Sequence, residues 1–181
     1  EDPQERLLSL LQARRAAYAE VPHHIDTTHR STAQVVEDVL ALHRAEPRVW
    51  RVRTPTGTYQ VHLAPGGLAH LGALLRTREI SSRVAVVSDE HVWPLHGAAL
   101  SAALRDSAYS PIEVILPAGE AHKNLDTVRL IYDRLADGGL DRSGAVIALG
   151  GGVITDMAGF AAATYMRGVP LVQAPTTLLG M

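Results

Sequence analysis

The chain has 181 residues, of which 46% are apolar and 20% are charged, a composition typical of a soluble globular protein. Its formal net charge of −2 argues against a nucleic-acid or anionic-membrane partner, and no apolar run is long enough to cross a bilayer. Because cysteine is absent, disulfides and thiolate metal sites are excluded, and we expect a cytoplasmic protein.

The first part of the chain predicts a small helical appendage. Residues 5–20 have helical spacing of apolar positions, and residues 24–27 read as a short strand or an extended segment. A second helix should begin at Ser31, where Ser31 and Gln34 fit a capping box, and should end near Ala45, before Pro47.

After Pro47 the pattern changes, which predicts a boundary near residue 46 between a first part, 1–46, and a second part, 47–181. Residues 49–54 and 58–63 alternate between apolar and polar side chains around a Pro-Thr-Gly turn, so they predict a β-hairpin.

Beyond the hairpin, strands and helices alternate, which predicts an α/β fold with a doubly wound, mostly parallel sheet. The expected strands are 84–88, 112–116, 145–149 and 170–174, and the expected helices are 92–106, 125–137 and 153–166.

The strongest local signal is the run of three glycines, Gly150 to Gly152, between an apolar strand and a helix. Glycine lets a phosphate approach the backbone, and the helix start offers free N–H groups. Neither Gly-x-Gly-x-x-Gly nor a Walker A loop is present, so a tight turn without a ligand stays an alternative.

Polar residues near the expected carboxyl edge of the sheet have two interpretations each. Asp89 could accept ribose hydrogen bonds or cap the next helix, and Asp156 suits the first helical turn without any ligand. Lys123 is the only lysine, against sixteen arginines, which suggests a need for a compact ammonium in this loop. The histidines show no metal-ligand spacing, so no metal site is assigned to this chain.

Taken together, these motifs resemble 3-dehydroquinate synthase over about residues 48–181. The resembling segments are Pro117–Lys123, Leu140–Arg142, Leu149–Ala162, Thr164–Gly168 and Pro175–Leu179. The resemblance implies a Rossmann-like NAD-binding domain, with the metal-binding domain of that family lying beyond Met181.

The resemblance also implies roles for individual residues. The NAD site would include Asp89, His91, Glu120, Lys123, Gly151, Gly152, Val153, Asp156, Thr176 and Thr177. His91 stands where the family usually has asparagine, which puts the ribose contact in doubt. Arg167 would bind the substrate phosphate, across the interface of a homodimer.

The implied reaction converts 3-deoxy-D-arabino-heptulosonate 7-phosphate to 3-dehydroquinate and phosphate, with transient oxidation by NAD. A divalent metal, zinc or cobalt, assists it in the full-length enzyme. Its ligands belong to the half of the family that this chain lacks.

The first 46 residues resemble the C-terminal end of shikimate kinase, in Leu10–Tyr18, Ile25–Thr27 and the helix at Ser31. That resemblance implies that Arg14 contacts shikimate, while the sites for ATP and magnesium lie mostly outside this chain. Both resemblances belong to one pathway, which suggests a bifunctional shikimate kinase/3-dehydroquinate synthase.

The chain has no initiator methionine and stops directly after an apolar segment, so we expect a fragment that is inactive alone. The alternatives are another sugar-phosphate cyclase, an iron- or zinc-dependent polyol dehydrogenase, and a non-catalytic NAD-binding module. Arg167 and the 117–123 motif speak against the polyol dehydrogenase.

Overall fold

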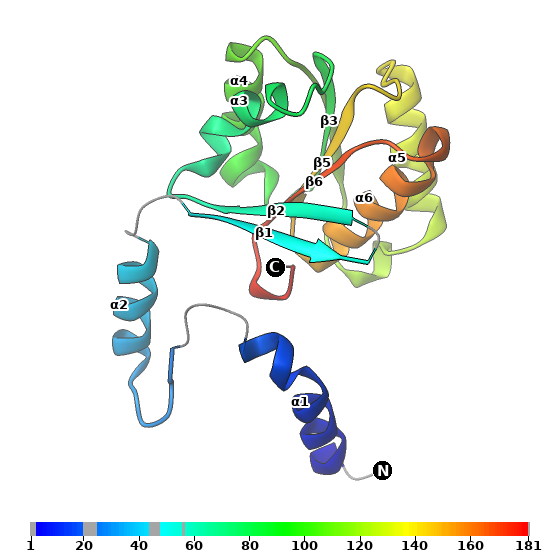
Figure 1. Cartoon of the computed structure of the whole chain (residues 1–181). Helices are drawn as coiled ribbons and strands as arrows, with labels where there is room; N and C mark the ends of the chain where they lie inside the picture. Colours follow the sequence, from blue (N-terminus) through cyan, green and yellow to red (C-terminus); the bar gives the residue numbers. More distant parts are fainter. Residues whose placement is uncertain (1–2, 20–24, 44–47, 56, 181) are drawn as a thin grey trace. The chain divides into compact units, whose positions relative to one another are not determined.

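A computed structural model describes residues 3–19, 25–43, 48–55 and 57–180. Contacts between α-carbons divide the chain into two compact units, Glu1–Pro65 and Gly66–Met181 (Figure 1). The hairpin therefore falls in the first unit, although its sequence pattern begins after residue 46. The boundary near residue 46, which the change of sequence pattern after Pro47 predicts, stays a prediction.

Two helices form where the sequence predicts them in the first unit. They are α1, Pro3–Ala19, and α2, Thr32–His43. The predicted end of the second helix, near Ala45, lies outside the described residues. No strand forms at 25–27, and the chain turns at residues 28–29 instead.

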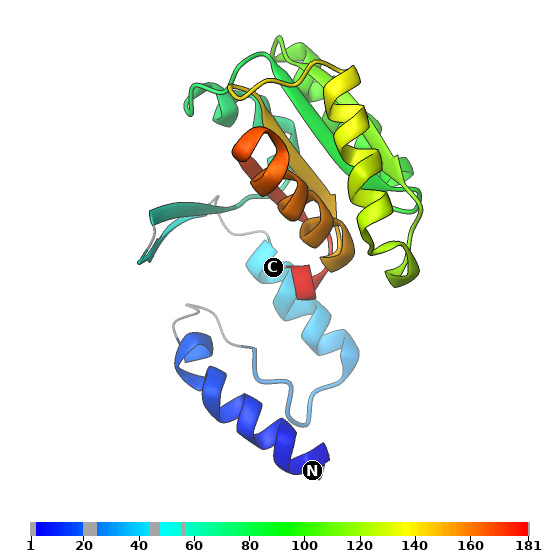
Figure 2. The same cartoon turned by 90° about the vertical axis from the view of Figure 1, so that its right-hand side faces the viewer.

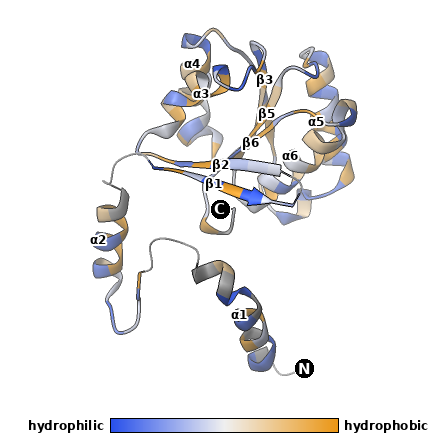
Figure 3. Ribbon diagram, in the orientation of Figure 1, coloured by the Kyte–Doolittle hydropathy of each residue, from blue (hydrophilic) through white to orange (hydrophobic). Residues whose placement is uncertain are grey.

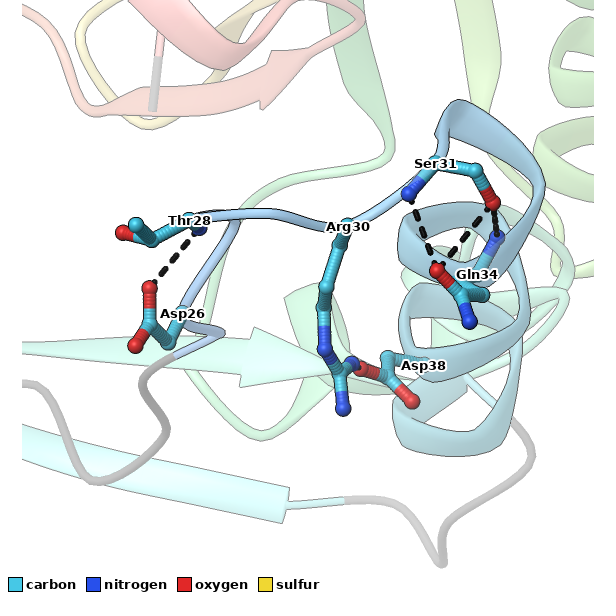
Figure 4. Close-up of polar contacts among 6 residues, drawn as sticks. All are labelled: Asp26, Thr28, Arg30, Ser31, Gln34 and Asp38. Atoms are coloured by element: carbon cyan, nitrogen blue, oxygen red, sulfur yellow. Dashed lines mark hydrogen bonds and ion pairs between the residues drawn. The ribbon is translucent and has the colours of Figure 1, made fainter.

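A capping box fixes the start of α2, as the sequence predicts (Figure 4). The Ser31 N–H donates to Gln34 Oε1 at 2.9 Å, and the Gln34 N–H donates to Ser31 Oγ at 3.3 Å. Before the cap, the Thr28 N–H donates to Asp26 Oδ1 at 2.9 Å. Arg30 forms an ion pair with Asp38 of the helix. These short-range contacts set where the helix begins.

Replacing Ser31 with alanine should destabilise the start of α2 by about 1 kcal/mol, because the Gln34 N–H loses its acceptor, Ser31 Oγ. Hydrogen exchange at the first-turn amides should then accelerate about fivefold. Ser31→Asn, which keeps a good capping acceptor, serves as the control. Unchanged exchange in Ser31→Ala would show that the cap contributes nothing.

The predicted hairpin is formed by β1, Arg48–Thr54, and β2, Gly57–Leu63, which pair antiparallel. Hydrophobic and hydrophilic residues both occur along β1 (Figure 3), and its half-buried residues are Arg48, Trp50 and Val52. Because successive side chains point to opposite faces, the register gathers apolar residues on one face. The pairs on that face are Arg48–Leu63, Trp50–Val61 and Val52–Tyr59.

Four parallel strands form the sheet of the second unit, in the order β4-β3-β5-β6. They are β3, Arg83–Asp89; β4, Ser110–Leu116; β5, Ala145–Gly150; and β6, Leu171–Pro175. The first connection leads from β3 to its neighbour on one side, and the next crosses back to β5 on the other side of β3. The predicted parallel sheet is thus confirmed.

Helices cover both faces of this sheet, as a doubly wound fold requires (Figures 1 and 2). On one face lie α3, Leu71–Arg76, and α4, Ala98–Asp106; on the other lie α5, Leu125–Asp137, and α6, Gly152–Thr164. Two hydrophobic clusters result, one on each face. Adjacent residues of one strand, such as Val86 and Val87, enter opposite clusters because side chains alternate.

Two helical segments differ from the sequence prediction. The sequence pattern predicts no element at residues 64–82, yet a 3₁₀ turn, Gly67–His70, and α3 form there. The helix expected over 92–106 begins as a π-helical turn, Trp93–Gly97, before α4. Pro94 has no N–H to donate, and the Trp93 ring occupies the space beside Gly97, where a Cβ would lie 2.2 Å away.

No helix among the described residues combines the length and apolar character needed to span a membrane.

Candidate functional site

The topology creates a crevice at the carboxyl ends of β3 and β5. The chain leaves β3 toward β4 on one side and leaves β5 toward β6 on the other side. Loops that diverge from adjacent parallel strands leave a gap, which is the usual ligand site of open α/β sheets. β3 and β5 pair directly, with Val87 opposite Ala148. The residues that follow these two strands therefore lie on either side of the gap.

A cleft of about 270 Å³ occupies this position. It is lined by Asp89, His91, Val92, Ala118, Gly119, Gly151, Gly152, Val153, Ile154, Thr176 and Thr177. Seven of the ten residues predicted for the nucleotide site are in this set; the other three are Glu120, Lys123 and Asp156. The structure thus brings together residues that follow all four strands.

The glycine turn joins the end of β5 to the start of α6. Gly151 is the N-terminal cap of α6, with extended backbone, and the Thr176 N–H donates to the Gly150 carbonyl at 2.9 Å. A Cβ on Gly150 would lie 2.7 Å from Ile154 Cβ, so packing excludes a side chain there. A Cβ on Gly152 would meet no atom within 4 Å. Packing therefore explains the first glycine, whereas the third leaves open space beside the cleft.

Asp89 caps the next turn and also lines the cleft, so the capping interpretation is confirmed and the role as a ribose acceptor stays a prediction. Its Oδ1 accepts the N–H groups of His91 and Val92, each at 2.9 Å. These bonds fix the turn that carries both Asp89 and His91 at the cleft. The carboxylate is half-buried, and the imidazole is exposed.

Lys123 links the loop after β4 to α6. Its Nζ lies 2.8 Å from Asp156 Oδ2 and 3.4 Å from Glu120 Oε1. The hydrogen bond to Asp156, and then the charges of Asp156 and Glu120, raise the pKa of Lys123 above the ordinary lysine value. The sequence placed all three residues in one site; the structure assembles them as an ion-pair cluster outside the set that lines the cleft.

Two further contacts hold the same loop. The Ala118 N–H donates to Glu90 Oε1 at 3.2 Å, and Asn124 caps α5 by accepting the Thr127 N–H at 3.0 Å. Gly119 has φ +104°, a conformation that favours glycine. The loop is therefore held at Ala118 and again at Asn124, around the residues Ala118 and Gly119 that line the cleft.

Sequence reasoning missed four residues that line the cleft, Val92, Ala118, Gly119 and Ile154. Ala118 and Gly119 lie in the Pro117–Lys123 motif, and a glycine in a motif between a strand and a helix could have signalled a close backbone approach. Val92 and Ile154 carry no such signal.

The two predicted substrate-binding arginines do not line this cleft. Arg167 is exposed on the 3₁₀ turn Tyr165–Arg167, where Met166 and Arg167 have φ of 51° and 68°. Arg14 is exposed on α1 in the other unit. Among the described residues, no group of three or more His, Asp or Glu could hold a metal ion.

Comparison with known sequences gives a match to one family. A family model described as 3-dehydroquinate synthase N-terminal matches residues 113–181. The chain is 46% identical over 129 residues to the 3-dehydroquinate synthase of Citrifermentans bemidjiense, and 48% identical over 128 residues to that of Neisseria meningitidis serogroup B. Each match covers 71% of this chain but only 36% and 35% of the relatives, so the chain spans about a third of their length.

Solved structures agree on the fold. A 2-deoxy-scyllo-inosose synthase is similar with a TM-score of 0.68 at 23% identity, over 74% of this chain and 37% of that one. A 2-epi-5-epi-valiolone synthase from Streptomyces hygroscopicus with NAD+ and Zn2+ bound has a TM-score of 0.53 at 36% identity, over 58% of this chain and 29% of that one. By sequence the chain is similar to 3-dehydroquinate synthases, and by fold it is similar to 2-deoxy-scyllo-inosose synthase and 2-epi-5-epi-valiolone synthase.

Proposed function

We propose that this chain forms the NAD-binding part of a 3-dehydroquinate synthase, which converts 3-deoxy-D-arabino-heptulosonate 7-phosphate to 3-dehydroquinate and phosphate. One observation carries the proposal. The glycine turn at the start of α6 and the Asp89 carboxylate at the end of the neighbouring strand β3 line the same cleft. This cleft lies where the connections from β3 and β5 lead to opposite sides of the sheet.

The cleft residues fit a dinucleotide. Backbone N–H groups at the start of α6 bind the pyrophosphate, and the space beside Gly152 admits it. Asp89 accepts hydrogen bonds from a ribose, because it follows the strand adjacent to the glycine turn. The Thr176 and Thr177 hydroxyls contribute further hydrogen bonds. NAD, when bound, supplies the transient removal and return of a hydride.

The remaining parts of the site are assigned outside the cleft. Arg167, exposed on its turn, binds the substrate phosphate, and in a homodimer it reaches the partner's site. As the resemblance implies, the zinc or cobalt ion of the reaction is held by ligands that lie outside this chain. That assignment agrees with a chain that spans about a third of its relatives.

We also propose that residues 1–46 are the end of a shikimate kinase fused to the synthase, with Arg14 contacting shikimate. On α2, Val36, Val39 and Leu40 remain 49%, 50% and 42% exposed, which supports a face that packs against further kinase sequence. The test is the parent reading frame. A Walker A loop upstream of residue 1 supports the fusion, and a frame without one refutes it.

A second candidate is another sugar-phosphate cyclase, favoured by the 36% identity to the 2-epi-5-epi-valiolone synthase. The higher identity to 3-dehydroquinate synthases, over more of the chain, favours the first candidate. Assays of the parent protein with the heptulosonate phosphate and with sedoheptulose 7-phosphate distinguish the two.

The proposal predicts that the 181-residue chain binds NAD weakly and catalyses neither the synthase reaction nor the phosphorylation of shikimate, because one wall of the cleft and the metal ligands belong to sequence outside it. Calorimetric titration with NAD, a phosphate-release assay with the heptulosonate phosphate and an ADP-release assay with ATP and shikimate check this. Absence of NAD binding, or turnover by the chain alone, would contradict it. NAD binding as tight as that of the parent protein would favour a non-catalytic NAD-binding module.

A further inference from the structure

Glu90 lies where β3 and β4 separate beside the cleft. Its N–H donates to the carbonyl of Leu116, the last residue of β4, at 3.0 Å. In a regular parallel ladder, the carbonyl of the same residue would then accept the N–H two residues further along the neighbouring strand. That donor is Ala118, but its N–H donates to Glu90 Oε1 at 3.2 Å. The carboxylate of Glu90 therefore takes the place of its own backbone carbonyl.

A side chain can make this contact where the backbone of the two strands has already separated. Pro117 carries no N–H, so Ala118 offers the first backbone donor after the end of β4. A glutamate holds its acceptor oxygens at the end of a long side chain, so the chain leaves the ladder while the contact persists. Directly after Ala118, Gly119 turns the chain with φ +104°.

The contact holds one wall of the cleft. Asp89, Ala118 and Gly119 line the cleft from the side of β3 and β4, opposite the residues that follow β5 and β6. A Cβ on Gly119 would meet no atom within 4 Å, so open space lies beside this wall. Glu90 itself is exposed and does not line the cleft. Any effect of Glu90 on a ligand in the cleft therefore passes through Ala118 and Gly119.

We propose that Glu90 is a positioning residue for NAD, and that it acts through the reach of its side chain rather than through its charge. It ties Ala118 to the turn after β3 and so sets the wall beside the ribose that Asp89 meets. Without this contact the loop must be ordered when NAD binds, which lowers the affinity. The inference rests on the proposed NAD site and assigns a role to a residue outside the cleft lining.

Three variants of the 181-residue chain separate reach from charge. Glu90→Gln keeps the length and an acceptor oxygen but removes the charge, whereas Glu90→Asp keeps the charge on a shorter side chain. Glu90→Ala removes both. By titration calorimetry, we expect Glu90→Ala and Glu90→Asp to bind NAD about fivefold more weakly, as the loss of one hydrogen bond provides. Glu90→Gln should stay within about twofold of the wild type, because the Ala118 N–H keeps its acceptor.

Amide hydrogen exchange measures the contact without any ligand. The Ala118 N–H should exchange about fivefold faster in Glu90→Ala and Glu90→Asp, and close to the wild-type rate in Glu90→Gln. The Glu90 N–H is the internal control, because its bond to the Leu116 carbonyl involves backbone atoms alone. Thermal denaturation verifies that each variant is folded.

A charge effect predicts the opposite order of NAD affinities. Binding by Glu90→Asp as tight as that of the wild type, or by Glu90→Gln as weak as that of Glu90→Ala, overturns the inference. Unchanged NAD affinity in Glu90→Ala overturns it as well, even where the Ala118 N–H exchanges faster. Each of these results leaves the proposed function standing. Absence of NAD binding by the wild type overturns the proposed function, and the inference with it.

Discussion

Gly152→Ala should lower the affinity for NAD by more than about tenfold while leaving the fold at least as stable. A Cβ at Gly152 meets no atom within 4 Å, so the protein itself does not require glycine there. Gly152 is the first residue of α6, where alanine reduces the entropy of the unfolded chain and stabilises by up to about 1 kcal/mol. The methyl group would occupy the space through which a pyrophosphate approaches the helix start.

Gly150→Ala is the matched control because it should lower the stability of the fold, which Gly152→Ala should not. Its Cβ would lie 2.7 Å from Ile154 Cβ, and Ile154 is buried, so overpacking should destabilise the fold by about 1–3 kcal/mol. Thermal denaturation measures stability, and titration calorimetry measures NAD affinity. A Gly152→Ala variant with unchanged NAD affinity would show that no phosphate sits at this turn. A large loss of stability in that variant would mean that the glycine is structural.

The parts of the fold that the sequence predicts well are governed by short-range patterns. Helix α5 lies at Leu125–Asp137, where the apolar spacing and the following glycines place it. The buried strands around Val86 and Ile147 are continuous apolar runs, which identify parallel strands covered on both faces. The Ser31 cap needs only a partner three residues away. In each case the information lies within one turn or one strand.

Other features depend on tertiary contacts that no local pattern records. The π-helical turn at Trp93–Gly97 reflects how the Trp93 ring packs on Gly97, and α3 is too short to show a clear period. The sequence predicts Asp156 in the first turn of its helix, but α6 begins at Gly152, so Asp156 lies beyond that turn, and only the topology brings it to Lys123. The family resemblance therefore groups Lys123 with the cleft residues, and the structure shows it paired with Asp156 and Glu120 beside them; its place in the NAD site stays a prediction.

Lys123→Met should lower the affinity for NAD about tenfold or more, because the loop that brings Ala118 and Gly119 to the cleft loses its link to α6. Asp156→Asn should have a similar effect, and the double variant should be no worse than the stronger single variant, since one contact is lost in each. The raised pKa of Lys123 means that this contact is fully present below the ordinary lysine value of 10.5 and is lost only as the pH rises through the higher folded-state value. The loss in Lys123→Met should therefore be the same at pH 7 and pH 9.

Glu120→Gln separates the anchor from its weaker partner. Glu120 lies 3.4 Å from the ammonium and its side chain is 74% exposed, so solvent screens this pair and the NAD affinity should fall less than about threefold. Titration calorimetry of the four variants gives the comparison. Additive losses in the Lys123→Met, Asp156→Asn double variant would contradict the anchor and indicate that each side chain binds NAD separately. A larger loss of NAD affinity in Glu120→Gln than in Lys123→Met would indicate that Glu120 binds NAD directly. An anchoring role of Lys123 predicts the larger loss in Lys123→Met.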